Sequence, residues 1–61
     1  MKFKKGDSVQ ASRDLPYPDR TIKAGTSGVV TGVFGLQRFY LVDFVGDSEH
    51  RMTQEADLKR S

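Results

Sequence analysis

Two neighbouring stretches of the chain carry runs of apolar residues that are typical of paired β-strands. Residues 28–34 and 38–44 are rich in β-branched and aromatic residues, and turn-forming residues bound both of them. The glycine-containing segment 24–28 precedes the first stretch, and Gly35 begins the short break between the two. This pattern predicts a β-hairpin, which we expect to form the centre of the fold.

The alternation within 38–44 assigns its residues to two faces of a sheet. One face carries Tyr40, Val42 and Phe44, and the other carries Phe39, Leu41 and Asp43. Because the Asp43 carboxylate is expected to stay in water, we assign the first set to the core. Phe39 and Leu41 then lie on the outer face, together with Val29 from the neighbouring strand. Either a partner contacts this cluster or a loop or terminus of the chain covers it, and both interpretations stay open.

Gly32 lies inside the first of these strands and predicts a β-bulge at Thr31 and Gly32. A bulge at this point would allow Val30 and Val33 to point inward despite their odd spacing. It would also bend the strand, so we expect the sheet to curve over its own core.

Shorter elements are predicted on both sides of the hairpin. They are a first strand over 8–13 with Val9 and Ala11 inward, a fourth strand over 49–53 with Met52 inward, a helical or 3₁₀ turn over 54–57, and a final strand over 58–60 with Leu58 buried. Phe3 is expected to fold back onto the core. Residues 14–23 contain both prolines, which exclude a helix there. Within them, Leu15 and Ile22 are expected to be buried, and Tyr17 is expected to present its ring outward.

Five short strands with one helical or 3₁₀ turn before the last predict an all-β fold, a five-stranded SH3-like barrel. The order of features resembles the SH3-like small-barrel group, which includes photosystem I reaction-centre subunit IV and the KOW and Tudor-like modules. The resemblance rests on the segments 3–9, 24–30, 40–44 and 56–58. It implies a single SH3-like barrel domain over residues 1–61, but it implies no ligand, because a fold does not specify a function.

One enzyme family also has a similar size and layout, the type II (plasmid) dihydrofolate reductases. They are tetramers of small barrels whose central pore binds folate and NADPH through a short Val-Gln-Ile-Tyr strand. The corresponding residues here, 50–53, read His-Arg-Met-Thr and lack the glutamine and the tyrosine. An oligomeric NADPH-dependent reductase is therefore a remote alternative, since the binding residues of that family are not present.

Composition limits the remaining choices. The chain has 61 residues, no cysteine, and ten basic against eight acidic side chains, for a net charge of +2. A chain of this size buries only about 60% of its unfolded surface, so its stability should be marginal and a partner or an oligomer would help to stabilise it. No apolar run has membrane-spanning length and no signal-peptide pattern follows Met1. We therefore expect a soluble cytoplasmic protein with no membrane partner.

The sequence offers no catalytic or metal-binding constellation. His50 is the sole histidine, and no cysteine accompanies it as a ligand. No serine lies in a nucleophile elbow, and the glycines of 25–28 precede a predicted strand where a phosphate-binding loop would need a helix. We expect a protein that is not an enzyme and has neither a cofactor nor a metal.

Binding is the function class that remains, and two surfaces are candidates. For docking on a larger protein or assembly, the expected contacts are the apolar residues Tyr17, Phe39 and Leu41 with Arg38 and Arg51 as a polar rim. The first and last strands of such a fold lie close together, which would gather basic side chains for RNA or DNA: Lys2, Lys4, Lys5, Lys59 and Arg60. Self-association into a homo-oligomer also stays open.

Overall fold

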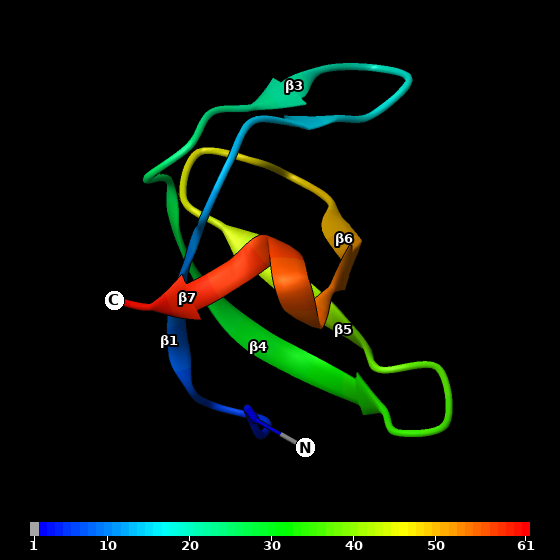
Figure 1. Cartoon of the computed structure of the whole chain (residues 1–61). Helices are drawn as coiled ribbons and strands as arrows, with labels where there is room; N and C mark the ends of the chain where they lie inside the picture. The colour runs from blue at the N-terminus through cyan, green and yellow to red at the C-terminus, as the bar shows by residue number, and fades with distance from the viewer. Residues whose placement is uncertain (1) are drawn as a thin grey trace.

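The computed structural model describes residues 2–61, and most of its strands form one antiparallel sheet (Figure 1). The strands of this sheet are β1 (Ser8–Ala11), β4 (Ser27–Phe34), β5 (Phe39–Phe44), β6 (His50–Gln54) and β7 (Leu58–Arg60). Their order across the sheet is β6-β5-β4-β1-β7, and a 3₁₀ turn, η1 (Glu55–Asp57), leads into β7. The prediction of an all-β fold with a five-stranded sheet and one turn before the last strand is confirmed. The first strand ends two residues earlier than predicted.

A second, two-stranded sheet forms where the sequence predicted only irregular structure. It consists of β2 (Leu15–Pro16) and β3 (Thr21–Ile22), with Leu15 paired to Ile22. Figure 1 shows this small hairpin at the opposite end of the molecule from the N-terminus. Both Leu15 and Ile22 are buried as predicted, so the hairpin closes one end of the core.

The core is formed by side chains from the inner face of the five-stranded sheet and from the segments that close it. Its buried apolar residues are Phe3, Val9, Ala11, Leu15, Ile22, Val30, Tyr40, Val42, Phe44 and Leu58. The rings of Phe3 and Tyr40 meet edge to face with their centroids 5.5 Å apart. The core assignment of Tyr40, Val42 and Phe44, the burial of Leu58 and the inward fold of Phe3 are confirmed.

The predicted bulge is present between Val30 and Gly32, where the register of β4 against β5 shifts. Val30 is buried, but the expectation that Val33 fills the core is wrong, because 39% of Val33 is exposed. The reason is the short length of β1, which pairs with β4 only as far as Val29. Beyond the bulge, β4 extends past β1, so Val33 has the core residue Tyr40 on one side and no strand on the other.

The side chains of β6 point the opposite way from the prediction. Met52 was expected to face the core, but it is 47% exposed, whereas Arg51 and Thr53 are buried. The register explains this, since Arg51 lies opposite the core residue Val42 and Met52 lies opposite Leu41. A strand places alternate residues on the same face as their cross-strand partners. The helical content of residues 2–61 includes nothing long and apolar enough to cross a membrane.

Candidate interaction surfaces

The outer sheet face is the side of β4, β5 and β6 that points away from the core. We use this name for five apolar residues: Val29, Phe34, Phe39, Leu41 and Met52. Phe34 lies opposite Phe39, and Leu41 lies opposite Met52 on its other side. Val29 and Phe34 are each 43% exposed, while Phe39 and Leu41 are half-buried. The register therefore places Met52, which sequence reasoning assigned to the core, beside the two residues predicted for this surface.

Gly32 lies beside Leu41 on this face. The two residues are cross-strand partners, and a Cβ at Gly32 would lie 3.4 Å from the Cβ and Cδ1 atoms of Leu41. Thr31 marks the polar border of the surface, because its hydroxyl donates to the Leu41 carbonyl at 3.3 Å and contacts His50 Nδ1 at 3.2 Å. The outer sheet face is thus an apolar surface with polar groups at its edge.

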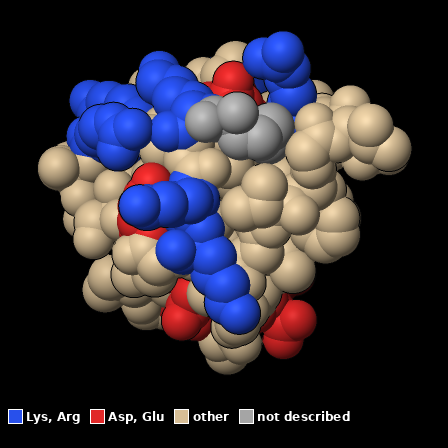
Figure 2. All heavy atoms as spheres, turned by 90° about the horizontal axis from the view of Figure 1, so that it is seen from below, with Lys and Arg blue, Asp and Glu red and all other residues tan. Residues whose placement is uncertain are grey.

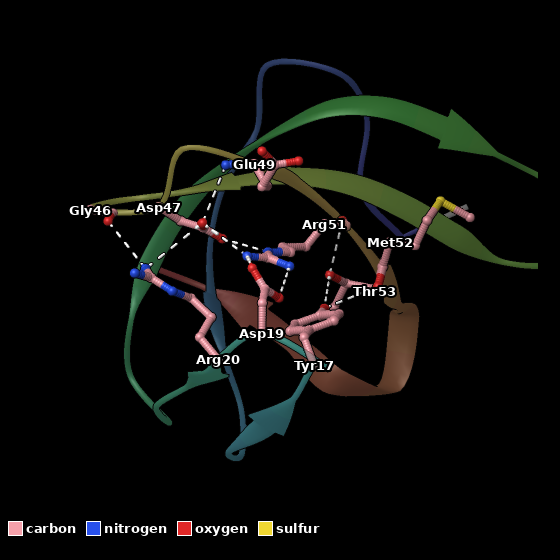
Figure 3. Close-up of polar contacts among 9 residues, drawn as sticks. All are labelled: Tyr17, Asp19, Arg20, Gly46, Asp47, Glu49, Arg51, Met52 and Thr53. Carbon is pink, nitrogen blue, oxygen red and sulfur yellow. Dashed lines mark hydrogen bonds and ion pairs between the residues drawn. The ribbon is translucent and has the colours of Figure 1, made fainter.

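A second cluster lies at the end of the molecule that β2 and β3 close, and Arg51 is at its centre (Figure 3). The guanidinium donates to both carboxylate oxygens of Asp19, Nη1 at 2.7 Å and Nη2 at 2.8 Å. Its Nε donates to Asp47 Oδ2 at 2.6 Å, and Nη2 also reaches Asp47 Oδ1 at 3.1 Å. Arg51 therefore joins the loop between β2 and β3 to the turn between β5 and β6.

The neighbours of Asp47 complete this Arg51 cluster. The Glu49 amide donates to Asp47 at 3.2 Å, and Arg20 forms an ion pair with it at 3.8 Å while donating to the Gly46 carbonyl. Although only 2% of the Asp47 side chain is exposed, the hydrogen bonds from Arg51 lower its pKa to about 2. The same guanidinium lowers the pKa of Asp19, and the two carboxylates raise the pKa of Arg51. The cluster is charged and saturated with partners.

Tyr17 belongs to this cluster and does not present its ring outward, so that prediction is wrong. The Arg51 guanidinium lies over the Tyr17 ring, with Cζ 5.1 Å from the centroid. The phenol donates to the Met52 carbonyl at 3.0 Å and contacts Thr53 Oγ1 at 3.1 Å. The ring is half-buried against the core. Tyr17 and Arg51, predicted as a docking anchor and its rim, are therefore engaged within the chain.

The basic end is the third surface, and we define it by Lys2, Lys4, Lys5, Arg38 and Arg60. Pairing of β1 with β7 brings Arg60 to the N-terminal segment, where its guanidinium donates to the Lys2 carbonyl at 3.0 Å. The Lys2 ammonium and the Arg60 guanidinium lie 5.6 and 5.4 Å from the centroid of the Phe3 ring. Lys59 alternates with Arg60 and points to the opposite face of β7, so this predicted member is not brought to the group.

Two carboxylates within the basic end already have partners. Glu55 accepts from the Tyr40 hydroxyl at 2.6 Å and from the Lys2 amide at 3.1 Å, and Arg38 Nη1 lies 3.7 Å from it. The Tyr40 hydroxyl lowers the pKa of Glu55, while burial and the Glu55 hydrogen bond raise the pKa of Tyr40. Asp7 accepts from the Lys4 amide and lies 3.9 Å from Arg60. Figure 2, seen from below Figure 1, shows several basic side chains on this side of the molecule.

The side chains that could bind a metal ion are dispersed over residues 2–61. Within residues 2–61, no three His, Cys, Asp or Glu side chains come together in an arrangement that could hold a metal ion. In the stretch that corresponds to the reductase pore strand, Arg51 and Thr53 are buried, so only His50 and Met52 face outward. Neither the metal ligands nor the pore residues considered above are assembled among the described residues.

Comparison with known proteins connects these surfaces with no known family. No protein-family model matches the chain, and no curated protein or solved structure is significantly similar to it. The candidate function therefore depends on the properties of three surfaces: the outer sheet face, the Arg51 cluster and the basic end. Sequence reasoning found the first and most of the third. It missed Asp19 and Asp47, whose only sequence signal is their position in turns, after Pro18 and Gly46.

Proposed function

We propose that this protein is a small non-catalytic interaction module that docks on a larger protein or assembly through its outer sheet face. The single observation that carries the proposal is the register, which places apolar residues of three adjacent strands side by side on the face away from the core. A partner that covered this face would remove their apolar surface from water, which contributes about 25 cal/mol per Å².

The composition of the outer sheet face supports a protein partner. Phenylalanine and methionine are enriched at protein interfaces, where they form a dry centre inside a polar border. Here Thr31 and His50 supply polar groups at one side, and the largely exposed Arg38 lies next to Phe39 in the chain. Arg38, Phe39 and Leu41 thus retain the docking role assigned from the sequence. Met52 and Phe34 replace Arg51 and Tyr17 in it.

We also infer that the sheet belongs to the SH3-like small-barrel type. The bulge in β4, the pairing of the first strand with the last, and the 3₁₀ turn before β7 support this inference. In such a fold the strands curve around a single core and leave one face of the central strands available to partners.

Site-specific photo-crosslinking in an extract of the native cells tests the docking proposal. A photoreactive residue at position 52 should give a discrete crosslinked partner, and the same residue at position 45, at the far end of β5, should not. Val45 is a matched control because it is apolar and largely exposed. Adding Val29→Ser to the position-52 probe should abolish the crosslink. Equal crosslinking from positions 45 and 52, or none at 52, would contradict the proposal.

Nucleic-acid binding by the basic end is the second candidate, and the concentration of charge there supports it. The aromatic rings near it favour this candidate less. Phe3 is buried beneath Lys2 and Arg60, and Tyr17 is held in the Arg51 cluster, so neither ring is free for a base to stack on. We therefore rank nucleic acid below a protein partner. A mobility assay with RNA and DNA at low salt tests this ranking, since a shift abolished by Lys4→Glu would reverse it.

A further inference from the structure

The β4–β5 hairpin projects from the body of the molecule. The pairing of β1 with β4 ends at Val29, and Gly6 and Asp7 contact β4 only at Val30. From Gly32 to Phe34, β4 pairs with β5 alone. Figure 1 shows the turn between these strands reaching beyond the rest of the fold, on the same lower side as the N-terminus.

The tip of this hairpin carries exposed apolar side chains on both faces and in the turn, beside the exposed polar residues Gln37 and Arg38. Leu36 in the turn is 97% exposed, and the exposed Phe34 lies on the outer face of β4. Val33 is also exposed, and it points to the opposite face because it pairs with the core residue Tyr40. A protein groove usually contacts one face of a hairpin. Exposed apolar groups on both faces and at the turn suit a medium that surrounds the tip.

The basic end lies beside the tip. Glu55 connects the two, because it accepts from the Lys2 amide and lies 3.7 Å from Arg38, which directly follows the turn. In the view of Figure 2, basic side chains cover much of this side, and an uncharged projection at the right edge lies where Figure 1 places the β4–β5 turn.

Charge is strongly asymmetric between this end and the rest of the chain. The five cations of the basic end are accompanied by Asp7 and Glu55, which leaves a net charge of +3. The whole chain carries +2, so the remaining residues sum to −1. The Asp7 and Glu55 side chains are each only 20% exposed and are already hydrogen-bonded. The surface field at this end is therefore positive.

Arg38 adds a cation at a position that disfavours it. Its φ of 57° makes it the one non-glycine residue among 2–61 with a left-handed backbone, where glycine or asparagine is the usual choice. Its guanidinium is largely exposed and has only the long contact to Glu55. An ion pair this exposed contributes little to stability, so the fold alone does not explain an arginine here.

We propose that the hairpin tip and the basic end attach this protein to the surface of an anionic phospholipid bilayer. Leu36 and Phe34 enter the interfacial region, and the cations of the basic end lie at the level of the lipid phosphates. Exposed apolar groups next to basic residues are the combination that holds peripheral proteins on such membranes. This mode of attachment requires no membrane-spanning segment, so the length of the apolar runs in the sequence does not indicate it.

The depth of insertion follows from the backbone. The β4–β5 ladder continues to the Phe34–Phe39 pair, but beyond Val30 the other edge of β4 has no neighbouring strand, so its backbone groups there must stay hydrated. The polar backbone of the turn itself must stay hydrated or contact lipid headgroups. Attachment is therefore shallow and reversible. It shares Phe34 and Arg38 with the proposed docking surface, whereas Leu36 belongs to the membrane contact alone and Met52 and Val29 lie farther back on the sheet.

Nucleic acids and acidic proteins fit the same end less well. Both would neutralise its cations, but phosphates and carboxylates have no use for an aliphatic Leu36 at the most projecting point. Single-stranded nucleic acid would stack its bases on exposed rings, and here only Phe34 is available because Phe3 is covered by its own cations. The lipid surface is the partner that uses both the charge and the apolar tip.

Vesicle co-sedimentation of the purified protein tests the proposal. Vesicles of phosphatidylcholine alone are compared with vesicles containing 30% phosphatidylglycerol, at low salt. We expect binding to the anionic vesicles at least about tenfold tighter than to the neutral ones, and weaker binding as salt screens the cations. No binding to anionic vesicles, or equal binding to both kinds, would overturn the proposal. Binding to RNA but not to vesicles would assign the basic end to nucleic acid instead.

Matched variants separate the two contributions. Leu36→Ser should weaken vesicle binding about tenfold or more through lost apolar contact, and Lys4→Glu about fivefold or more through lost charge. The controls are Val45→Ser and Lys23→Glu, which make the same changes away from the basic end and should alter binding less than the paired variant. Leu36 makes no core contact, so the folded state survives its substitution. Vesicle binding unaffected by Leu36→Ser would show that charge alone accounts for the interaction, and it would overturn the proposal. That result would have no bearing on docking through Met52.

Discussion

At β6, the inner face of the five-stranded sheet buries polar residues while the outer face exposes an apolar one. On the inner face β6 buries Arg51 and Thr53, and on the outer face it exposes Met52. One strand away, β5 follows the usual rule, with Tyr40 and Val42 buried. Burial at the edge of this sheet therefore depends on which partners each side chain finds. Arg51 binds two carboxylates on the inner face, and Met52 has Leu41 as an apolar neighbour on the outer face.

The inner face can accept a charge because the loops supply complete partners for it. Asp19 comes from the loop between β2 and β3 and Asp47 from the turn before β6, so three separate segments meet at one guanidinium. Within residues 2–61, every buried side-chain nitrogen and oxygen atom has a hydrogen-bond partner. The outer face has no such closure, and its apolar groups stay in contact with water.

Removing the Arg51 guanidinium should have the largest effect on the stability of the inner face. Arg51→Ala leaves the nearly buried Asp47 carboxylate without its main partner, and loss of one member of a buried ion pair is strongly destabilising. We expect the melting temperature to fall by on the order of 10 °C or more. Arg51→Lys should recover only part of this, since an ammonium cannot bind Asp19 in a bidentate manner. Thermal denaturation followed by circular dichroism measures both.

Arg13→Ala is the matched control for this prediction. Arg13 forms a single exposed ion pair with Asp57 at 2.8 Å, so its loss should shift the melting temperature by only a few degrees, about 4 or less. Similar shifts for Arg13→Ala and Arg51→Ala would show that the Arg51 cluster does not hold the loops together.

Acid should weaken the same cluster without any substitution. The pKa of Asp47 is about 2 in the folded protein and that of Asp19 is also lowered, so both carboxylates bind protons more weakly folded than unfolded. Their contribution to stability is complete above about pH 4 to 5 and is lost as the pH falls toward about 2. The melting temperature of the wild type should fall over this interval. Arg51→Met should show a flatter profile, and an equally steep one would exclude the cluster as the cause.

Two glycines of β4, Gly28 and Gly32, allow the two faces to be tested separately. A Cβ at Gly28 would lie 2.8 Å from Val42 Cγ1 and 3.0 Å from the Asp43 carbonyl oxygen, so Gly28→Ala overpacks the inner face. We expect a loss of about 1–3 kcal/mol in the free energy of unfolding. A Cβ at Gly32 would lie 3.4 Å from the nearest Leu41 side-chain atoms, which is an ordinary contact distance, so Gly32→Ala should change stability by less than about 0.5 kcal/mol. Urea denaturation tests the pair, and equal losses would contradict the assignment of the faces.

The sequence predicted well those features that depend on local pattern. Alternation in β5 identified Tyr40, Val42 and Phe44 as core residues, and Gly32 identified the bulge. Both signals act over a few residues, because side chains alternate along a strand and an interior glycine weakens regular pairing. The candidate outer surface at Phe39 and Leu41 came from the same alternation.

Features that depend on contacts between distant segments could not be predicted in this way. Met52 was predicted to face inward from a polar strand, but only the register of β6 against β5 fixes which face it occupies. The burial of Arg51 depends on Asp19, which lies 32 residues away, and the position of Tyr17 depends on the same cluster. The prediction that Val33 fills the core was wrong for a related reason, because the end of β1 leaves that part of β4 without a strand on one edge.

Substitutions on the outer sheet face should have the smallest effect on folding, and this makes them informative. Met52→Ser should change the free energy of unfolding by less than about 0.5 kcal/mol, whereas Val42→Ala on the inner face should cost about 2 kcal/mol. Urea denaturation of both variants checks the difference. A large loss for Met52→Ser would mean that the outer face contributes to the core. If Met52→Ser folds normally and Val29→Ser abolishes the crosslink from position 52, stability cannot be the reason that this face is apolar, and docking becomes the remaining explanation.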